Sequence, residues 1–169
     1  VTNPGGASAT LAGGFTYVAA GVVRSLSAAT YTPGTLLTVT IVAAPDTSKS
    51  GYAAEDTPPA GWTVSAISSG GAWDGTNGKV KWGPFPSDVW ARKLTYKVLP
   101  PAGATGTQTF AGVMSVDGTD VVIGGVSQIN ATVVVPTLTA IAPASGTTVG
   151  GTAVTLTGTN FVAGVTATV

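Results

Sequence analysis

Glu55 and Asp56 are neighbouring carboxylates and are therefore candidates for general acid/base catalysis. General acid/base catalysis by carboxyl groups needs a second carboxyl at a defined separation in a cleft, and the spacing of the acidic residues supplies none. The alternative is structural, with Glu55 at a strand end pairing with Arg92 or Lys93. We predict a structural ion pair between Glu55 and Arg92, of the kind that serves specificity more than stability.

Four tryptophans within residues 52–96 offer a second kind of chemistry, because a flat aromatic surface can stack against sugar rings. Trp62 and Trp82 occupy alternating apolar positions, which favours a place in the core. Trp73 and Trp90 lie at the margins of loops. With Tyr31, they are the predicted ligand-binding residues if the protein recognises carbohydrate.

Asp117 and Asp120, in the segment VDGTD, resemble part of a calcium loop. Two acids with one glycine provide fewer ligands than calcium needs, so a hairpin turn is the preferred interpretation. The chain contains no cysteine and no histidine, and no serine lies in a nucleophile-elbow pattern. The sequence therefore predicts no catalytic residue, no metal site and no cofactor, and we expect the protein not to be an enzyme.

The composition limits the possible partners. Only 8% of the 169 residues are charged and the formal net charge is zero, so the sequence gives no electrostatic case for binding nucleic acid or an anionic membrane, both of which need a basic face. No apolar run approaches the roughly 20 residues that a membrane span requires. A chain rich in Thr and Val, with 24 Gly and 11 Pro, is typical of an all-β extracellular protein.

Alternating apolar residues predict an all-β, antiparallel sandwich at residues 22–135, built from about nine short strands. Within it, the alternation at 62–66 and at 80–82 predicts a hairpin, with Gly and Asn between the two runs. The segment 90–98 alternates in the same way and predicts the next strand. No window shows helical periodicity over three turns.

The two ends of the chain resemble the TIG/IPT family of immunoglobulin-like domains. Members begin with P-x-I-x-x-I-x-P-x-x-G-x-x-x-G-G-T-x-V-T-I-x-G-x-x-F and finish near N-P-G-G followed by F-x-Y. The opening is matched by Pro136, Ile141, Pro143, Gly146, Gly150, Gly151, Thr152, Val154, Leu156, Gly158 and Phe161. The close is matched by Asn3, Pro4, Gly5, Gly6, Phe15 and Tyr17. The resemblance implies that residues 1–20 end one such domain and that residues 136–169 form the first half of another.

The central part, from Arg24 to about Ile129, is similar to an uncharacterised immunoglobulin-like module of large secreted bacterial proteins. We therefore expect a non-catalytic structural module of a repetitive bacterial extracellular or cell-surface protein. Neither partial domain can bury its inner face alone, so its expected partners are other copies of the chain or neighbouring immunoglobulin-like domains. Head-to-tail strand complementation would then make a fibre. The alternative is a carbohydrate-binding, adhesive module whose partner is a polysaccharide.

Overall fold

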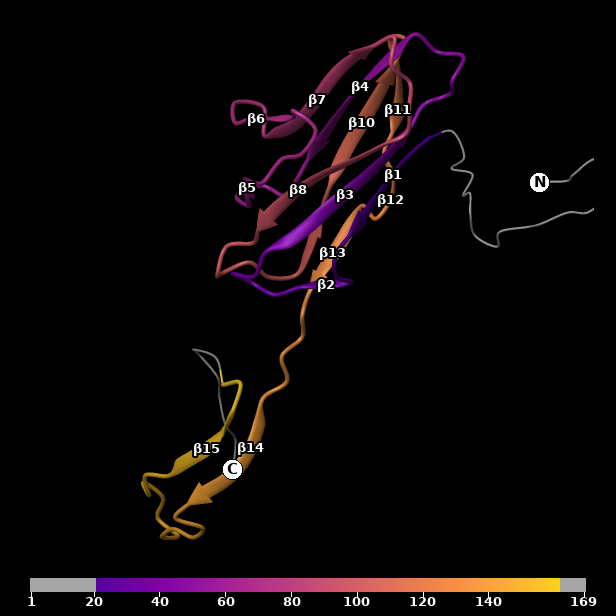
Figure 1. Cartoon of the computed structure of the whole chain (residues 1–169). Coiled ribbons are helices and arrows are strands. Elements are labelled where there is room, and N and C mark those ends of the chain that lie inside the picture. The colour runs from indigo at the N-terminus through magenta and orange to yellow at the C-terminus, as the bar shows by residue number, and fades with distance from the viewer. Residues whose placement is uncertain (1–20, 162–169) are drawn as a thin grey trace, which may run out of the picture. The chain divides into compact units, whose positions relative to one another are not determined.

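The computed structural model describes residues 21–161, and these divide into two units after Ala131. The sequence predicted this boundary at residue 135. The predicted partial domain at residues 1–20 lies outside the described residues, as do residues 162–169. Each unit is described by itself (Figure 1).

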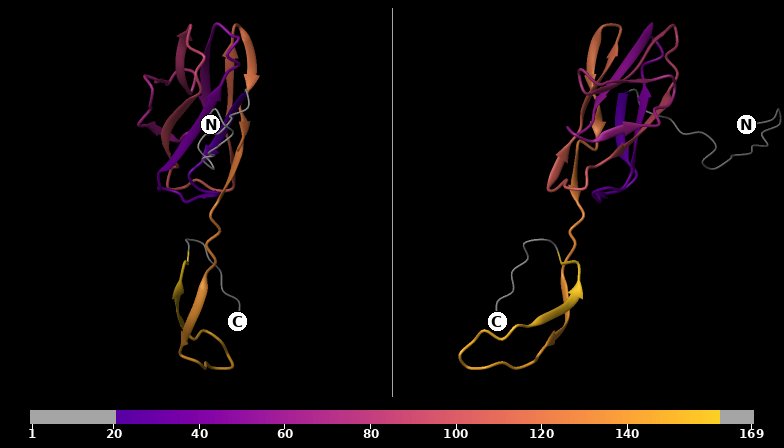
Figure 2. Two further views of the ribbon diagram at one scale, coloured as in Figure 1. Left: turned by 45° about the vertical axis from the view of Figure 1, so that its right-hand side comes forward. Right: turned by 90° about the vertical axis from the view of Figure 1, so that its left-hand side faces the viewer.

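The first unit is a sandwich of two five-stranded sheets, and Figure 2 shows it from two further directions. One sheet has the order β12 (Gly124–Gly125), β1 (Gly21–Leu26), β3 (Leu37–Ala44), β8 (Arg92–Leu99) and β5 (Thr63–Ser65). The other has the order β11 (Thr119–Val122), β10 (Ala111–Val116), β4 (Gly51–Thr57), β7 (Lys79–Pro86) and β6 (Ala72–Asp74). A three-stranded sheet consists of β2 (Thr30–Tyr31), β13 (Gln128–Ala131) and β9 (Thr107–Thr109).

The core lies between the two large sheets, because alternate residues of each strand point inward. On β3, Val39 and Ile41 are buried and pair across the ladder with Tyr96 and Leu94 of β8. The facing sheet contributes Tyr52, Ala54, Val80, Trp82 and Met114, among others. Trp62 and Trp82 are both buried, which confirms the prediction that they belong to the core. The predicted all-β sandwich is likewise confirmed.

Each side of the sandwich is closed by a segment that passes from one sheet to the other. On one side, β11 pairs with β10, and after Ile123 the chain continues as β12 beside β1. On the other side, β5 pairs with β8, whereas β6 pairs with β7. The indole nitrogen of Trp82 donates a hydrogen bond to the Ser68 carbonyl oxygen at 2.9 Å, which holds the β5–β6 connection in place.

The predicted hairpin between residues 62–66 and 80–82 is wrong. Residues 63–65 form β5 in one sheet, and residues 80–82 belong to β7 in the other sheet. The hairpin is instead β6–β7, closed by a turn in which Asp74 accepts a hydrogen bond from the backbone nitrogen of Asn77 at 3.1 Å. Both tryptophan-bearing segments are amphipathic in the same way, so alternation alone cannot distinguish pairing within one sheet from packing across two.

The second unit contains one antiparallel pair of strands, β14 (Thr137–Ala142) and β15 (Thr155–Thr159). Their register shifts between Leu138 and Ala140, so Thr139 forms a β-bulge. The Thr139 hydroxyl donates to the Thr157 carbonyl oxygen at 2.9 Å, which ties the bulged strand to its neighbour.

Candidate functional site

The structure removes Tyr31 from the predicted ligand-binding residues. Tyr31 has no exposed surface and packs edge-on against Trp62, with their ring centres 5.0 Å apart. Its hydroxyl donates to the Gly106 carbonyl oxygen at 3.2 Å. Because β2 joins the small sheet at one end of the core, the ring points into the sandwich and cannot contact a ligand.

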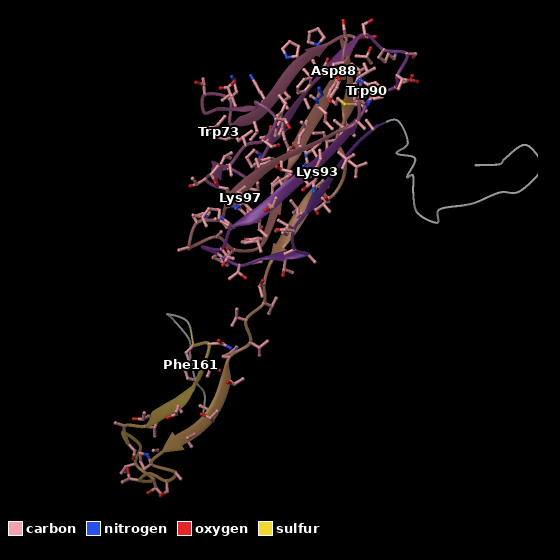
Figure 3. All side chains as sticks on the ribbon, viewed as in Figure 1. Trp73, Asp88, Trp90, Lys93, Lys97 and Phe161 are labelled. Carbon is pink, nitrogen blue, oxygen red and sulfur yellow. The ribbon has the colours of Figure 1, made fainter. Side chains whose placement is uncertain are left out.

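The two remaining candidates are exposed but do not form one platform. Trp90 is 77% exposed and Trp73 is 42% exposed. Trp73 pairs with Val80 near the start of β7, whereas Trp90 follows the end of that strand at Pro86. The strand between those two points measures about 20 Å at roughly 3.3 Å per residue. Figure 3 shows the two tryptophans well separated. Each could contact a sugar ring only as an isolated aromatic residue.

The predicted ion pair between Glu55 and Arg92 is wrong. Glu55 lies on the outer face of β4 and pairs with Lys79 of the adjacent strand. Arg92 begins β8 in the opposite sheet, where it pairs with Asp88. Its guanidinium carbon lies 4.3 Å from the centre of the Phe85 ring, a cation–π distance. The two residues belong to different sheets, and each finds a partner close to its own strand.

Asp117 lies in a hairpin turn and Asp120 lies on β11, the strand that follows it, in agreement with the preferred interpretation. Asp117 and Gly118 both have positive φ, 47° and 81°, as a two-residue turn between β10 and β11 requires. The Asp117 carboxylate accepts hydrogen bonds from the backbone nitrogens of Ser50 and Gly51, at 3.0 and 3.1 Å. It therefore fixes the neighbouring loop. Among residues 21–161, no group of three or more acidic side chains could hold a metal ion.

A buried ionic network, which the sequence reasoning missed, joins the two large sheets. Arg24 of β1 binds both carboxylate oxygens of Asp56 of β4, with its Nε 3.1 Å from Oδ2. The Tyr96 hydroxyl donates to the same Oδ2 at 2.7 Å, and Arg24 also donates to the Val126 carbonyl oxygen at 3.0 Å. Arg24 and Asp56 are almost completely buried. Burial, together with the adjacent charge of Asp56, raises the pKa of Tyr96 well above its usual range.

The side chains of Arg24, Asp56 and Tyr96 are at most 1% exposed and join the two sheets, so their arrangement supports a structural role. The only signal for this network in the sequence is the position of Asp56 in the alternation of inward and outward residues on β4. Asp56 follows Tyr52 and Ala54 at a spacing of two residues, which places a carboxylate on the inward face of β4. The partner could not be found in this way, because Arg24 is 32 residues away in the chain.

The second unit has an exposed apolar face. Leu138 pairs with Gly158 and Ile141 pairs with Leu156, so the bulge at Thr139 brings two residues that are three apart onto one face. That face is formed by Leu138, Ile141, Val154, Leu156 and Phe161, and we call it the apolar face of β14–β15. Four of these residues are 40–58% exposed and Leu156 is partly buried.

The same unit has no electrostatic protection. All seven basic and all seven acidic side chains lie between residues 24 and 120, so residues 121–169 carry no charge. Edge strands in soluble proteins are usually guarded by charged side chains, by proline or by a covering segment. Within residues 132–161, β14 and β15 have only each other as strand partners, and Pro136 and Pro143 flank β14 rather than interrupt it. Within residues 132–161, the apolar face and the outer edges of the two strands therefore have no covering segment.

Comparison with known proteins agrees with the sequence reasoning at this end of the chain. Residues 136–169 match the family model described as IPT/TIG domain. The match supports an immunoglobulin-like fold for these residues, whereas the partial domains predicted at the two ends and the predicted central module stay predictions. IPT/TIG domains are non-enzymatic and immunoglobulin-like, which is consistent with a structural or interaction module.

The crystal structure of the human F-spondin reeler domain (fragment 1) shows a weaker likeness. It is 12% identical, with a TM-score of 0.44, over 68% of this chain and 93% of that one. No curated protein matches the chain. In residues 21–161, no helix is long and apolar enough to cross a membrane.

Proposed function

We propose that this chain is a non-catalytic assembly module of a large, repetitive bacterial extracellular or cell-surface protein, in which copies join head to tail by strand complementation. The observation that carries the proposal is the apolar face of β14–β15, which no other segment within residues 132–161 covers. The match of residues 136–169 to the IPT/TIG family supports an interaction module of the immunoglobulin-like kind.

The apolar area of this face makes its burial favourable. Complete burial of one Val, Leu, Ile or Phe side chain contributes roughly 1.5–3 kcal/mol. A two-stranded hairpin is marginally stable by itself in water, so covering its apolar side stabilises both the contact and the hairpin. A partner that buried a charge against this surface would lose much of that gain.

The occupant that fits is residues 1–20 of a second copy. This segment carries no charged side chain and contains the apolar sequence Phe15-Thr16-Tyr17-Val18. In the resemblance to the IPT/TIG family, this segment corresponds to the end of a domain of the same type. Because donor and acceptor are different surfaces of one chain, each added copy leaves a new acceptor free. Contacts of this heterologous kind produce a filament unless the rotation closes a ring.

The test is light scattering over a wide dilution range, with negative-stain images of the same samples. We expect large species that persist on dilution and appear as uniform fibres. Leu156→Lys, on the apolar face, should abolish them. Thr157→Lys is the matched control, because Thr157 is the next residue and points to the opposite face of the same strand. Phe15→Ser should weaken assembly from the donor side.

The results of the scattering experiment would distinguish which segment covers the apolar face of β14–β15. A wild-type chain that is monomeric at all concentrations would overturn the assembly proposal. Loss of the large species with Leu156→Lys but not with Phe15→Ser would show that the apolar faces pair with one another. Equal loss with Leu156→Lys and Thr157→Lys would show that added charge alone, and not the apolar face, controls solubility.

Carbohydrate binding is a second candidate function, favoured by the exposure of Trp90 and Trp73. Titration with a panel of soluble polysaccharides should quench tryptophan fluorescence if either ring stacks on a sugar. Comparing Trp90→Phe with Trp73→Phe would identify which ring responds, since Trp62 and Trp82 are buried. No change in fluorescence over the whole panel would exclude this role for both residues.

A further inference from the structure

The two broad outer faces of the sandwich differ in charge. On the sheet that contains β4 and β7, the outer face carries the carboxylates of Glu55, Asp74 and Asp120 and the amines of Lys79 and Lys81. The outer face of the other sheet carries Lys93 and Lys97 on β8 and no carboxylate. The first face is slightly acidic, whereas the second, which we call the β8 face, is basic.

The registers place the residues of the β8 face in three rows. Lys93 pairs with Val42, which pairs with Val23. Thr95 pairs with Thr40, which pairs with Ser25. Lys97 lies between Thr38 on β3 and Ser65 on β5. The two amines are thus separated along the strand by a row of hydroxyl side chains.

Lys93 and Lys97 differ from the other basic residues in having no acidic partner within residues 21–161. Arg24, Lys79, Lys81 and Arg92 each form an ion pair with a carboxylate. Lys49 lies near Asp46 and contributes to the lowered pKa of that carboxyl, after the hydrogen bonds from Ser48. Lys93 and Lys97 are exposed, and both lie along β8 (Figure 3).

The distance between Lys93 and Lys97 limits the kinds of ligand that the β8 face can bind. Lys93 and Lys97 are four residues apart on one strand, about 13 Å at roughly 3.3 Å per residue. β8 lies inside its sheet, with β3 on one side and β5 on the other, so the separation is held rigidly. A complementary ligand carries negative charges at intervals along an extended chain and presents hydroxyl groups between them.

We propose that the β8 face binds an acidic polysaccharide of the polyuronate type. The two amines would bind carboxylates of the polymer, and Thr40 and Thr95 would face the sugar hydroxyls between them. This site is separate from the apolar face of β14–β15, so it does not depend on the assembly proposal. It also differs from stacking on Trp73 or Trp90, because it requires a charged ligand.

The test is affinity electrophoresis of the full chain in gels that contain polygalacturonate, with fully methyl-esterified polygalacturonate as the neutral comparison. We expect retardation by the acid form only, and its loss in salt near 1 M, where the screening length is about 3 Å. An exposed ion pair contributes roughly a twofold to fivefold change in affinity. The variant Lys93→Gln/Lys97→Gln should therefore bind about tenfold more weakly.

A matched control changes the net charge equally at another place. Lys49→Gln/Lys81→Gln removes two amines outside the β8 face and should retain wild-type retardation. Equal weakening in both double variants would show that net charge alone attracts the polymer and would overturn the site. So would equal retardation by the ester, or no retardation of the wild-type chain at low salt.

Two further measurements keep the outcomes distinct. Salt-sensitive self-association that Lys93→Gln/Lys97→Gln abolishes would identify the partner as the acidic face of a second copy, and would also overturn the proposal. Leu156→Lys should retain binding to polygalacturonate, since it changes only the apolar face of β14–β15. Failure of the assembly proposal would therefore leave this result unaffected.

Discussion

Residues 21–131 and residues 132–161 both consist of β-strands in which apolar and polar residues alternate. The two units differ in how they pair these strands and bury their apolar side chains. In the first unit, each side of the sandwich is closed by a segment that passes between the sheets, and large apolar side chains fill the interior. In the second, two strands pair only with each other and leave Leu138, Ile141 and Val154 exposed. The same local pattern therefore yields a self-contained sandwich in one unit and an exposed apolar face in the other.

Charge follows the same division. The sandwich contains every charged residue of the chain, including a buried pair, whereas the sequence after Asp120 contains none. Buried ionic groups cost desolvation energy and contribute specificity, because only one arrangement of the sheets satisfies them. Residues 132–161 contain no charged side chain, so we expect the register of this unit to depend on shape and apolar area. We expect the stability of the two units to respond to different variables.

The largest effect is expected from Asp56→Ala, which leaves Arg24 buried without its carboxylate and removes the acceptor of the Tyr96 hydroxyl. Loss of one partner of a buried pair destabilises a protein by about 3–5 kcal/mol. Urea unfolding, followed by the fluorescence of the buried tryptophans, would measure the change. Asp120→Ala is the control, since Asp120 lies on the outer face of its sheet.

A second variant distinguishes specificity from stability in the same network. Replacing both members, as in Arg24→Met/Asp56→Leu, should recover much of the loss, because no unpaired charge remains. If the single variant Asp56→Ala unfolded within 1 kcal/mol of the wild type, the network would not hold the sheets together. The contrast between the two units would then rest on edge closure alone.

The variant Gly125→Ala tests how much the pairing of β12 with β1 contributes to stability. Gly125 has φ of 78°, and a Cβ there would overlap the carbonyl oxygen of Arg24 on β1. We expect a loss of roughly 2–4 kcal/mol and faster amide exchange in β1, because β12 would separate from it. Gly34→Ala is the matched control, with φ of 73° and open space around the position, and should cost about 1 kcal/mol.

If Gly125→Ala and Gly34→Ala destabilised the chain equally, the close approach of β12 to β1 would contribute nothing. If Gly125→Ala also promoted association, the closing segment would be shown to protect the β1 edge in a way that the second unit lacks.

The smallest expected effect is a dependence of stability on alkaline pH, which should be present in the sandwich and absent from residues 132–161. The pKa of Tyr96 is raised in the folded state, chiefly by burial and then by Asp56. Its contribution is therefore complete below the unfolded pKa of about 10 and is lost as the pH rises above it, by up to about 1.4 kcal/mol per pH unit. Residues 132–161 contain no Asp, Glu, His, Cys, Tyr, Lys or Arg, so their pairing should not respond.

Unfolding of the sandwich between pH 9 and 11 would measure this slope, and Tyr96→Phe should reduce it. A slope that is unchanged in Tyr96→Phe would assign the alkaline sensitivity to another residue. Tyr52 is the next candidate, since burial raises its pKa as well.

The sequence predicted what depends on local pattern. Alternation identified the all-β class and the burial of Trp62 and Trp82, and the Asp117-Gly118 pair identified the turn between β10 and β11. The glycines and prolines of residues 136–169 identified the IPT/TIG resemblance, because they mark turns at fixed spacings. These features depend on a few consecutive residues, so they can be predicted from the local sequence.

The sequence did not predict what depends on which strands meet. The hairpin at residues 62–66 and 80–82 was wrong because β5 and β7 lie in opposite sheets. The Glu55–Arg92 pair was wrong for the same reason, and Tyr31 lies in a two-residue strand too short to show a phase. Arg24 and Asp56 meet across the sandwich, where nothing in their local sequences connects them.

The parallel pairings of the sandwich have a mechanical consequence. The first strands of the unit, β1 and β2, run parallel to the last, β12 and β13. Tension applied through Gly21 and Ala131 therefore pulls these neighbours in opposite directions along their length. The hydrogen bonds between them are loaded together in shear rather than opened one after another. We expect a chain of such units under tension to resist extension at these pairs, with the buried Arg24 side chain anchored directly behind them.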